Sequence, residues 1–244
     1  MKIFNIYPIK NQDMYANEDY AMILAHLLEK GLYDSSQFKS NFKVIMDNGV
    51  YENAKVSDSI ESLVKLANES NIIIDEIVIP DVIGDYTRTK QLYEENYNEM
   101  LKNRYDYTFM YVVHASNIKE LREAITMVNN EKYLDLVLGI PKKCKFDRTS
   151  REAIEAYKGC HVPIHFLGIR DCFEELLPVK DIIRSCDSVQ LCYITRDCEE
   201  DTDSLINQCR HNPAIDLEND YVDRMKLVDM KTKVNKELKD NGIL

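Results

Sequence analysis

Carboxylates stand at the ends of apolar runs at two matching places in the chain. Asp47 ends the run 44–46, just before the turn-forming pair Asn48 and Gly49, and Asp81 lies against the next such run. An apolar run that stops at a turn is typical of a buried strand. Parallel α/β folds carry their chemistry at the C-terminal ends of the strands, where neighbouring ends converge. The two carboxylates are therefore expected to share a pocket.

Two carboxylates in one pocket repel each other, and this restricts what the pocket can bind. One of them must keep its proton or meet a ligand that is rich in hydrogen-bond donors. A purine such as guanine is such a ligand, because N1–H and the exocyclic amine lie on one edge. Its O6 would take a hydrogen bond from a strand-end backbone N–H or from His114, which ends the run 110–113. Tyr51 would stack on the ring, although core packing explains this side chain equally well.

Glycines and further polar side chains stand at the same level of the predicted strands. Four of the seven glycines follow apolar runs: Gly49, Gly84, Gly139 and Gly168. A tight turn with positive φ explains any one of them, but four in register indicate strand-end N–H groups exposed as donors. Asp187 lies at this level in a later run, whereas His165 lies within its run and is expected inside the fold. Asp85 is explained as a helix N-cap.

One basic loop follows the fifth predicted strand. Its positive side chains are Lys142, Lys143, Lys145, Arg148 and Arg151. Such a run is usually a solvated face, but this is the one basic loop expected at the end of the strands where the carboxylates lie. We therefore expect Lys142 and its neighbours to contact a phosphate backbone.

Alternating strands and helices must position these side chains. The apolar runs predict strands at 2–6, 43–47, 76–81, 108–114, 134–140, 163–169 and within 182–194. Helical periodicity predicts helices at 20–28, 60–67, 93–101, 118–128, 153–157 and 173–177, and a long final helix at about 219–239.

The alternation predicts a single domain over residues 1–244. Repeats of about 30 residues give right-handed βαβ units and a parallel sheet, and several strands are apolar on both faces, as buried parallel strands are. Seven such repeats favour an α/β fold of the (β/α)8 (TIM) barrel type over a doubly wound sheet, which usually has about five or six strands. The eighth strand is expected near 215–217, in a polar stretch.

The composition fits one globular domain and argues against several other classes of protein. The chain has 244 residues, of which 45% are hydrophobic and 30% charged, which suffices for a large core. A net charge of −11 argues against a dedicated nucleic-acid or membrane-surface module, although it allows a local basic face. No apolar run is long enough to span a membrane, and the N-terminal apolar run is too short for a signal peptide.

The seven cysteines predict neither disulfides nor a metal site. Their number is odd and no Cys-x-x-Cys occurs, so we expect reduced packing thiols in a cytoplasmic protein. Cys192, Cys198, Cys209 and His211 match no zinc spacing, and no metal is expected. P-loop, Gly-x-Gly-x-x-Gly, Gly-x-Ser-x-Gly and His-Glu-x-x-His motifs are absent from the sequence, so the corresponding chemistries have no support and no cofactor is expected.

Six motifs, in order between residues 43 and 190, resemble those of tRNA-guanine transglycosylases. They are most similar to short phage and bacterial relatives, some of which put 7-deazaguanine bases into DNA. The first motif is Asp47-Asn48-Gly49-Val50-Tyr51-Glu52. The other five are Ile79-Pro80-Asp81-Val82-Ile83-Gly84-Asp85, Val112-Val113-His114-Ala115-Ser116, Leu138-Gly139-Ile140-Pro141-Lys142, Ile164-His165-Phe166-Leu167-Gly168-Ile169 and Arg184-Ser185-Cys186-Asp187-Ser188.

The resemblance implies a (β/α)8 barrel and a pentosyltransferase that exchanges bases. Guanine in nucleic acid, with DNA favoured over tRNA, would be replaced by a 7-deazaguanine derivative. Asp187 would be the nucleophile that attacks C1′ and releases guanine, and Asp47 would be the general acid/base for the departing and incoming bases. This chemistry resembles that of a retaining glycosidase, except that a base rather than water takes the sugar from the carboxylate.

The resemblance also implies contacts with the base. Tyr51 would stack on it, Asp81 would hold its amine edge, and O6 would meet His114 and the Gly139 backbone. Two further residues of these motifs complete the predicted substrate site: Lys142 and Gly168.

Three departures from the family pattern bear on these roles. The Cys-x-Cys-x-x-Cys…His zinc site of the tRNA enzymes is absent from the sequence, which counts against tRNA as the substrate. His114 stands where the family has Gln, which leaves the identity of the base open. Aligning residues 194–196 with the family's Pro-Thr-Arg would put Gln190 at the nucleophile position. The gap-free match of residues 186–189 with Phe-Asp-Cys-Val favours Asp187 instead.

Two other classes of function stay open. A nucleoside or sugar hydrolase would use the same barrel, with water in place of the incoming base. A non-catalytic base-binding subunit would fit the net charge of −11, because it would rely on a partner for affinity to nucleic acid. Release of guanine without incorporation would indicate the hydrolase, and binding without turnover would indicate the subunit.

Overall fold

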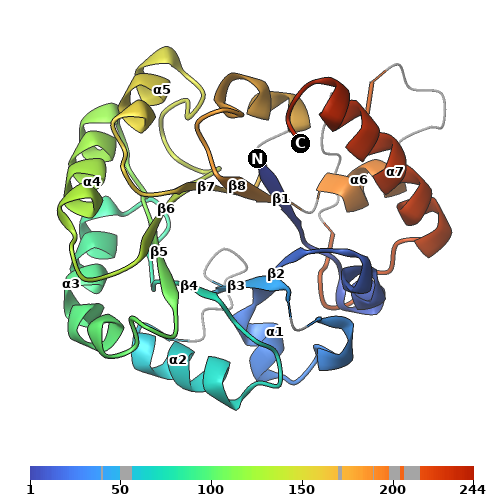
Figure 1. The fold of residues 1–244 in the computed structure, drawn as a ribbon, viewed down its shortest axis with the longest axis horizontal. Coiled ribbons are helices and arrows are strands. Elements are labelled where there is room, and N and C mark those ends of the chain that lie inside the picture. Colours follow the sequence, from blue (N-terminus) through green and yellow to red (C-terminus); the bar gives the residue numbers. More distant parts are fainter. Residues whose placement is uncertain (40, 50–56, 170–171, 189, 198–203, 206–214) are drawn as a thin grey trace.

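Eight parallel strands form one sheet that curls into a barrel, with helices outside it (Figure 1). The computed structural model describes the chain apart from residues 40, 50–56, 170–171, 189, 198–203 and 206–214. The strands are β1 (Lys2–Asn5), β2 (Tyr20–Leu24), β3 (Lys43–Asp47), β4 (Glu76–Val78), β5 (Thr108–Val112), β6 (Leu136–Pro141), β7 (Ile164–Leu167) and β8 (Ser185–Ser188). They pair in the order β1-β8-β7-β6-β5-β4-β3-β2, and the two strands that end this order, β1 and β2, lie side by side.

The helices form an outer ring around the strands (Figure 1). They are α1 (Ala25–Glu29), α2 (Ile60–Glu69), α3 (Tyr86–Lys102), α4 (Ile118–Asn130), α5 (Arg151–Lys158), α6 (Gln190–Asp197) and α7 (Arg224–Asp240), together with the 3-10 segments η1 (Ile9–Asn17), η2 (Ser35–Gln37) and η4 (Phe173–Val179). Parallel strands alternating with outer helices define a (β/α)8 TIM barrel. The predicted fold class is confirmed.

Side-chain caps fix where two of the outer helices begin. Asp85 caps α3, as predicted, by accepting a hydrogen bond from the Arg88 N–H at 2.9 Å. Asn117 caps α4 in the same way, accepting from the Glu120 N–H at 3.1 Å. Each cap satisfies an N–H group that has no partner within its helix. The chain is therefore anchored soon after it leaves β4 and β5, at the end of the barrel that carries the polar residues.

The apolar core has two parts, one on each face of the curled sheet. Inside the barrel, apolar side chains from six strands and the loop after β1 pack together: Phe4, Ile6, Met22, Ile45, Val78, Met110, Val112 and Val137. The larger part lies between the strands and the helices. Burial on both faces explains the apolar runs from which the strands were predicted.

The sequence-based prediction misplaced one strand. Residues 20–24 were assigned to a helix, but they form β2, which runs directly into the short helix α1. The run Tyr-Ala-Met-Ile-Leu is apolar at nearly every position, so its periodicity does not separate a buried strand from a helix. The eighth strand predicted near 215–217 does not exist. That segment is a loop. The Leu217 carbonyl accepts a hydrogen bond from the Ile9 N–H at 2.8 Å, and the Leu217 side chain packs against the apolar cluster inside the barrel.

The final helix begins later than predicted. Asp223 caps α7 by accepting from the Lys226 N–H at 2.8 Å, so the helix starts at Arg224 rather than near residue 219. Its buried face carries Leu227, Met230, Val234 and Leu238. Among the described residues, no helix has the length and apolar character needed to cross a membrane.

Cys186 and Cys192 are expected to resist alkylation in the folded protein. Both are buried. Burial raises the pKa of the Cys192 thiol to about 12. Burial, with a smaller contribution from the charge of Asp187, raises the pKa of Cys186 well above its usual range. Because the thiolate is the reactive species, iodoacetamide at mildly alkaline pH should label the half-buried Cys144 well before either thiol.

Peptide mass spectrometry of the alkylated protein measures this order of labelling. Unfolding the protein in guanidinium chloride provides the control, since all three thiols should then react at similar rates. Equal labelling of Cys144 and Cys192 in the native protein would contradict the buried placement.

Candidate active site

A cavity of about 540 Å³ opens at the C-terminal ends of the strands. This volume is typical of small-molecule and substrate sites. The cavity brings together residues that are far apart in the sequence, and six of the predicted site residues line it: Asp47, Asp81, His114, Lys142, Gly168 and Asp187. Gly139 does not line it, and Tyr51 lies outside the described residues.

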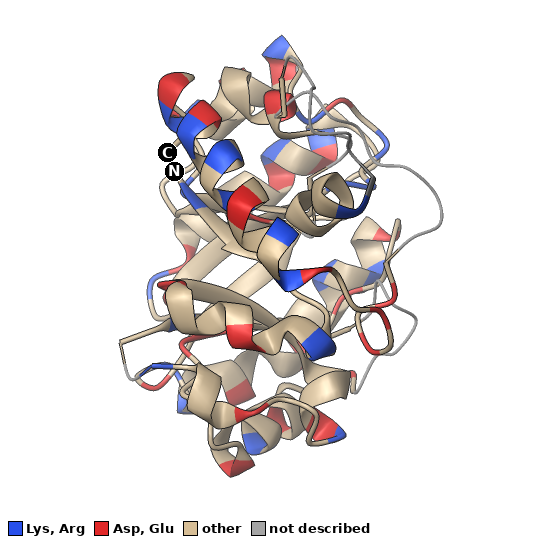
Figure 2. Cartoon of the chain, turned by 90° about the vertical axis from the view of Figure 1, so that its right-hand side faces the viewer, with Lys and Arg blue, Asp and Glu red and all other residues tan. Residues whose placement is uncertain are grey.

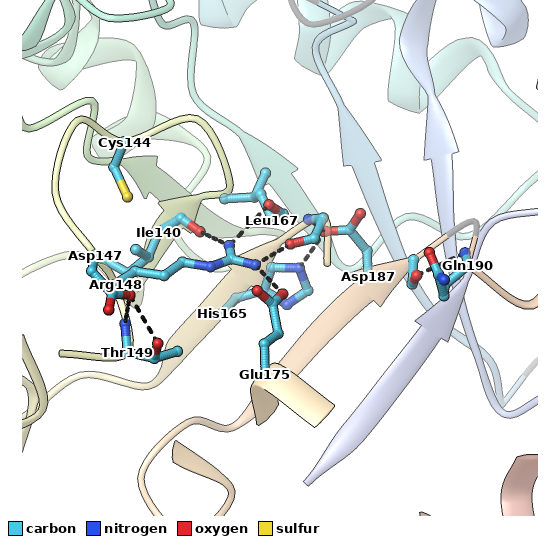
Figure 3. A network of polar contacts seen from close by, with 12 residues as sticks. Ile140, Cys144, Asp147, Arg148, Thr149, His165, Leu167, Glu175, Asp187 and Gln190 are labelled. Carbon is cyan, nitrogen blue, oxygen red and sulfur yellow. Dashed lines mark hydrogen bonds and ion pairs between the residues drawn. The ribbon is translucent and has the colours of Figure 1, made fainter. Parts of the chain in front are cut away.

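Asp187 is held at one carboxylate oxygen from two sides (Figure 3). Its Oδ1 accepts from the Gly168 N–H at 2.9 Å and lies 3.0 Å from His165 Nε2. No other described residue forms a hydrogen bond with this carboxylate, and the residue is only 6% exposed. The second oxygen is therefore available to a ligand in the cavity.

His165 is the contact of Asp187 that the sequence reasoning did not assign. The prediction that His165 lies inside the fold is confirmed, because the side chain is completely buried. Its neighbours Ile164 and Phe166 pack against the outer helices, so alternation along β7 turns His165 inward. In the register of β7 and β8, His165 lies opposite Ser185. Two residues further along β8 the chain reaches Asp187, on the same inward face.

The alternative nucleophile position is not in the cavity. Gln190 begins α6, is buried, and is absent from the cavity lining. Its backbone N–H donates to Ser188 Oγ at 2.8 Å, which fixes the turn between β8 and α6. Of the two candidate positions, Asp187 is the one with access to a substrate.

Asp81 is engaged by two neighbouring strand ends. Asn48 Nδ2 donates to Asp81 Oδ1 at 2.5 Å and to the Ile79 carbonyl at 3.0 Å, and His114 Nε2 is hydrogen-bonded to Asp81 Oδ2. All three side chains are buried. Donors within the protein therefore already compensate this carboxylate, so repulsion from Asp47 does not require a donor-rich ligand.

The same contact determines what His114 offers a ligand. A carboxylate accepts only, so a neutral His114 carries its hydrogen on Nε2 and leaves Nδ1 as an acceptor. His114 Nδ1 is buried and has no hydrogen-bond partner among the described residues. In this tautomer the ring cannot donate to a ligand carbonyl such as O6, because its only N–H is directed to Asp81.

Asp47 stands at the end of β3, which pairs with β4, and it lines the cavity beside Asn48 and Asp81. Its Oδ1 accepts from the Gly49 N–H at 2.7 Å, and Gly49 has a φ of 79°. Glycine adopts such a φ without strain. The turn that follows the strand therefore holds the carboxylate at the cavity wall.

The basic loop after β6 divides into two parts. Lys142 and Lys143 line the cavity, as a contact with phosphate groups would require. Arg148 is completely buried, so its expected place in a phosphate-binding face is wrong. Its guanidinium donates to the carbonyls of Ile140, Leu167 and Gly168.

Charges over the rest of this side of the molecule are mixed. Figure 2 shows acidic and basic residues interspersed on the side that carries α7, without a region of one sign. At the cavity itself both signs of charge are present: Asp216 and Glu218 belong to the lining, and Glu218 pairs with Lys30 at 2.5 Å. Ile215 is held by its N–H, which donates to Tyr193 Oη at 3.1 Å. This segment, which was predicted to form a strand, therefore lines the cavity.

Gly139 serves the packing of the barrel, and replacing it by alanine is expected to destabilise the protein by about 1–3 kcal/mol. A Cβ atom there would lie 2.6 Å from Leu167 Cδ1 and 3.0 Å from Met110 Sδ. Its carbonyl already accepts from the Val113 N–H at 2.8 Å. The matched control is Gly159→Ala, since a Cβ there meets its nearest atom at 3.4 Å. Urea unfolding measures the free energy of unfolding of both variants. Equal values for Gly139→Ala and Gly159→Ala would contradict the close packing around Gly139.

Metal ligands do not cluster in the part of the chain that the structure describes. Cys192 is buried, with its thiol near the Ile6 carbonyl, while Cys198, Cys209 and His211 lie outside the described residues. The fold and the cavity together define a TIM-barrel protein with carboxylates at the C-terminal ends of β3 and β8.

Comparisons with known proteins add little to this description. Neither protein-family models nor curated proteins match the chain. A solved structure, described as the crystal structure of the Amycolatopsis orientalis BexX/CysO complex, aligns with a TM-score of 0.49 and 10% sequence identity. The alignment covers 99% of this chain and 91% of that chain. A similarity of this size carries no argument about function.

Proposed function

We propose that the protein is a base-exchange glycosyltransferase. It replaces guanine in nucleic acid, DNA rather than tRNA, with a 7-deazaguanine derivative. The observation that carries the proposal is the carboxylate of Asp187, which is fixed at one oxygen and available at the other, in the same cavity as Asp47. The ordered motifs that resemble tRNA-guanine transglycosylases agree with this arrangement.

In the first half-reaction, the free oxygen of Asp187 attacks C1′ of the nucleoside. A C1′–O bond forms while the bond from C1′ to the guanine nitrogen breaks, and Asp47 donates a proton to the departing base. In the second half-reaction, the incoming base gives its proton to Asp47 and its nitrogen takes C1′ from Asp187. Covalent catalysis by a carboxylate divides one difficult displacement into two easier ones.

The cluster of Asp81, Asn48 and His114 would recognise the base. Asp81 and His114 line the cavity, and the hydrogen bond between them fixes the orientation of both side chains. Lys142 and Lys143 at the cavity would contact the flanking phosphates. Tyr51, which lies outside the described residues, is assigned to stacking on the base.

Incubation with labelled 7-deazaguanine precursors tests the proposal. Duplex DNA and tRNA are offered separately, and incorporation of label into DNA is expected. Absence of label from both nucleic acids, under conditions in which the protein stays folded, would contradict a base-exchange activity.

A hydrolase acting on free nucleosides is the second candidate, and one observation favours it. The segment 215–218 lines the cavity and contributes the carboxylates of Asp216 and Glu218 to it. Negative charge in the cavity lining opposes the approach of a phosphate backbone. Release of guanine from guanosine or deoxyguanosine, without incorporation of label into nucleic acid, would select this candidate.

A further inference from the structure

A line of hydrogen bonds crosses the barrel interior and ends at the carboxylate of Asp187. It begins at Glu76, whose two oxygens receive the Arg184 guanidinium at 3.0 and 3.2 Å. Arg184 Nε donates to Ser185 Oγ at 3.0 Å, and Ser185 Oγ lies 2.8 Å from His165 Nδ1. His165 Nε2 then meets Asp187 at 3.0 Å. Three strands, β4, β7 and β8, thus contribute to one connected path, together with Arg184, which directly precedes β8.

The chemistry of the donors gives this path a direction. Arginine only donates, so the Ser185 oxygen accepts from Arg184 and its own hydrogen is left for His165 Nδ1. The ring then carries its hydrogen on Nε2, and this hydrogen goes to the Asp187 carboxylate, which only accepts. Every hydrogen on the path has an acceptor in this arrangement. A hydrogen on Nδ1 would instead leave the Ser185 hydroxyl hydrogen without an acceptor on the path.

The path lies where aliphatic packing is the usual solution. The interior of a TIM barrel is generally filled by branched apolar side chains. Here the ring of Phe4 packs edge-on against the ring of His165, with 5.7 Å between the ring centroids. Glu76, Ser185, His165 and Asp187 are all buried. Well-packed apolar side chains are often at least as stabilising as a satisfied buried network of charged groups, so stability alone does not explain why this interior is polar.

We propose that His165 is a positioning residue for Asp187, with its tautomer set by Asp187 at Nε2 and by Ser185, which Arg184 orients, at Nδ1. Its Nε2–H and the Gly168 N–H hold the same carboxylate oxygen from two directions. Together they fix the plane of the carboxylate and direct the second oxygen to the cavity. The catalytic part of this inference rests on the proposed function, whereas the tautomer does not.

Nitrogen-15 NMR of the full chain, labelled at histidine, tests the tautomer without any substrate. The resonances of His165 are assigned by their loss in His165→Leu, and the exposed His161 provides an in-protein reference for a solvated ring. We expect the pattern of a ring with hydrogen on Nε2, and a shifted Nδ1 resonance in Ser185→Ala, which removes the donor to that nitrogen. An Nδ1–H ring, or a ring unchanged in Ser185→Ala, would overturn the inference.

Base exchange provides the second measurement. His165→Leu should lower kcat by about 10-fold to 100-fold with little change in KM, the size of effect that outer hydrogen bonds have on metal ligands. His165→Gln, whose amide can still donate to Asp187, should recover part of the loss, which a purely structural role would not predict. Thermal unfolding verifies that each variant is folded. If His165→Leu exchanges bases at the wild-type rate, the positioning role is wrong.

The two hypotheses fail differently. If the NMR pattern is as expected but the wild-type protein exchanges no base, the proposed function is wrong and the orientation of Asp187 by His165 stands. If the wild-type protein is active and Ser185→Ala alters neither the ring nor kcat, the proposed function stands and the positioning role is wrong.

Discussion

Replacing Asp187 by asparagine is expected to lower the rate of base exchange by about 10⁴-fold or more, as removal of a covalent nucleophile does in other enzymes. Asparagine keeps the shape of the side chain, and its oxygen can still accept from Gly168 and His165. The fold should therefore persist, while the amide cannot form a stable bond to C1′. Single-turnover incorporation of a labelled base into DNA measures the loss.

Asp85→Asn is the matched control for this variant. Asp85 is also an aspartate that follows a strand, but it is exposed, caps α3 and does not line the cavity. Asparagine caps helices about as well as aspartate, so this variant should exchange bases at the wild-type rate. Wild-type activity in Asp187→Asn would remove Asp187 from the mechanism.

Replacing Arg148 by methionine is expected to destabilise the protein by about 3–5 kcal/mol, the usual result of removing one partner of a buried ion pair. Its guanidinium is completely buried and donates to Glu175 Oε1 and to the Gly168 carbonyl, each at 2.6 Å (Figure 3). It also lies over the Phe166 ring, with 4.4 Å between the guanidinium carbon and the ring centroid. In the variant, the largely buried carboxylate of Glu175 and the carbonyls at the ends of β6 and β7 lose the hydrogen bonds that Arg148 donates.

Urea unfolding measures this loss, and two further variants interpret it. Arg151→Met removes an exposed arginine three residues later and should change stability little. Adding Glu175→Gln to Arg148→Met should recover part of the stability, because the carboxylate that faced the guanidinium is replaced by a neutral amide. A loss below about 1 kcal/mol in Arg148→Met, within the range of ordinary surface substitutions, would contradict the structural role of Arg148.

The fold was predictable because its strands are local, apolar and punctuated by turns. The run 43–47 became β3 with the predicted ends, and Asp85 became the predicted cap of α3. Residues 20–24 were missed because five successive residues that are almost all apolar fit a strand or a helix equally well. Only pairing with β3, which lies elsewhere in the sequence, decides between them.

The site was predictable as a set of strand-end residues, but its contacts were not. That Asp47, Asp81 and Asp187 reach one cavity follows from the rule that active sites of TIM barrels lie at the C-terminal ends of the strands. That His165 contacts Asp187 depends on the register of β7 against β8, which one sequence does not reveal. Arg148 stood among basic residues and looked solvated, since composition cannot show which member of a charged run folds inward.

Detection of a covalent link between Asp187 and a sugar tests the central claim most directly. The protein is incubated with guanine-containing duplex DNA in the absence of an incoming base, quenched with acid, digested and analysed by mass spectrometry. We expect a nucleotide adduct on the peptide that contains Asp187, guanine released in equal amount, and loss of the adduct when a 7-deazaguanine base is added. Base exchange without an adduct, or an adduct on the Asp47 peptide alone, would contradict the account.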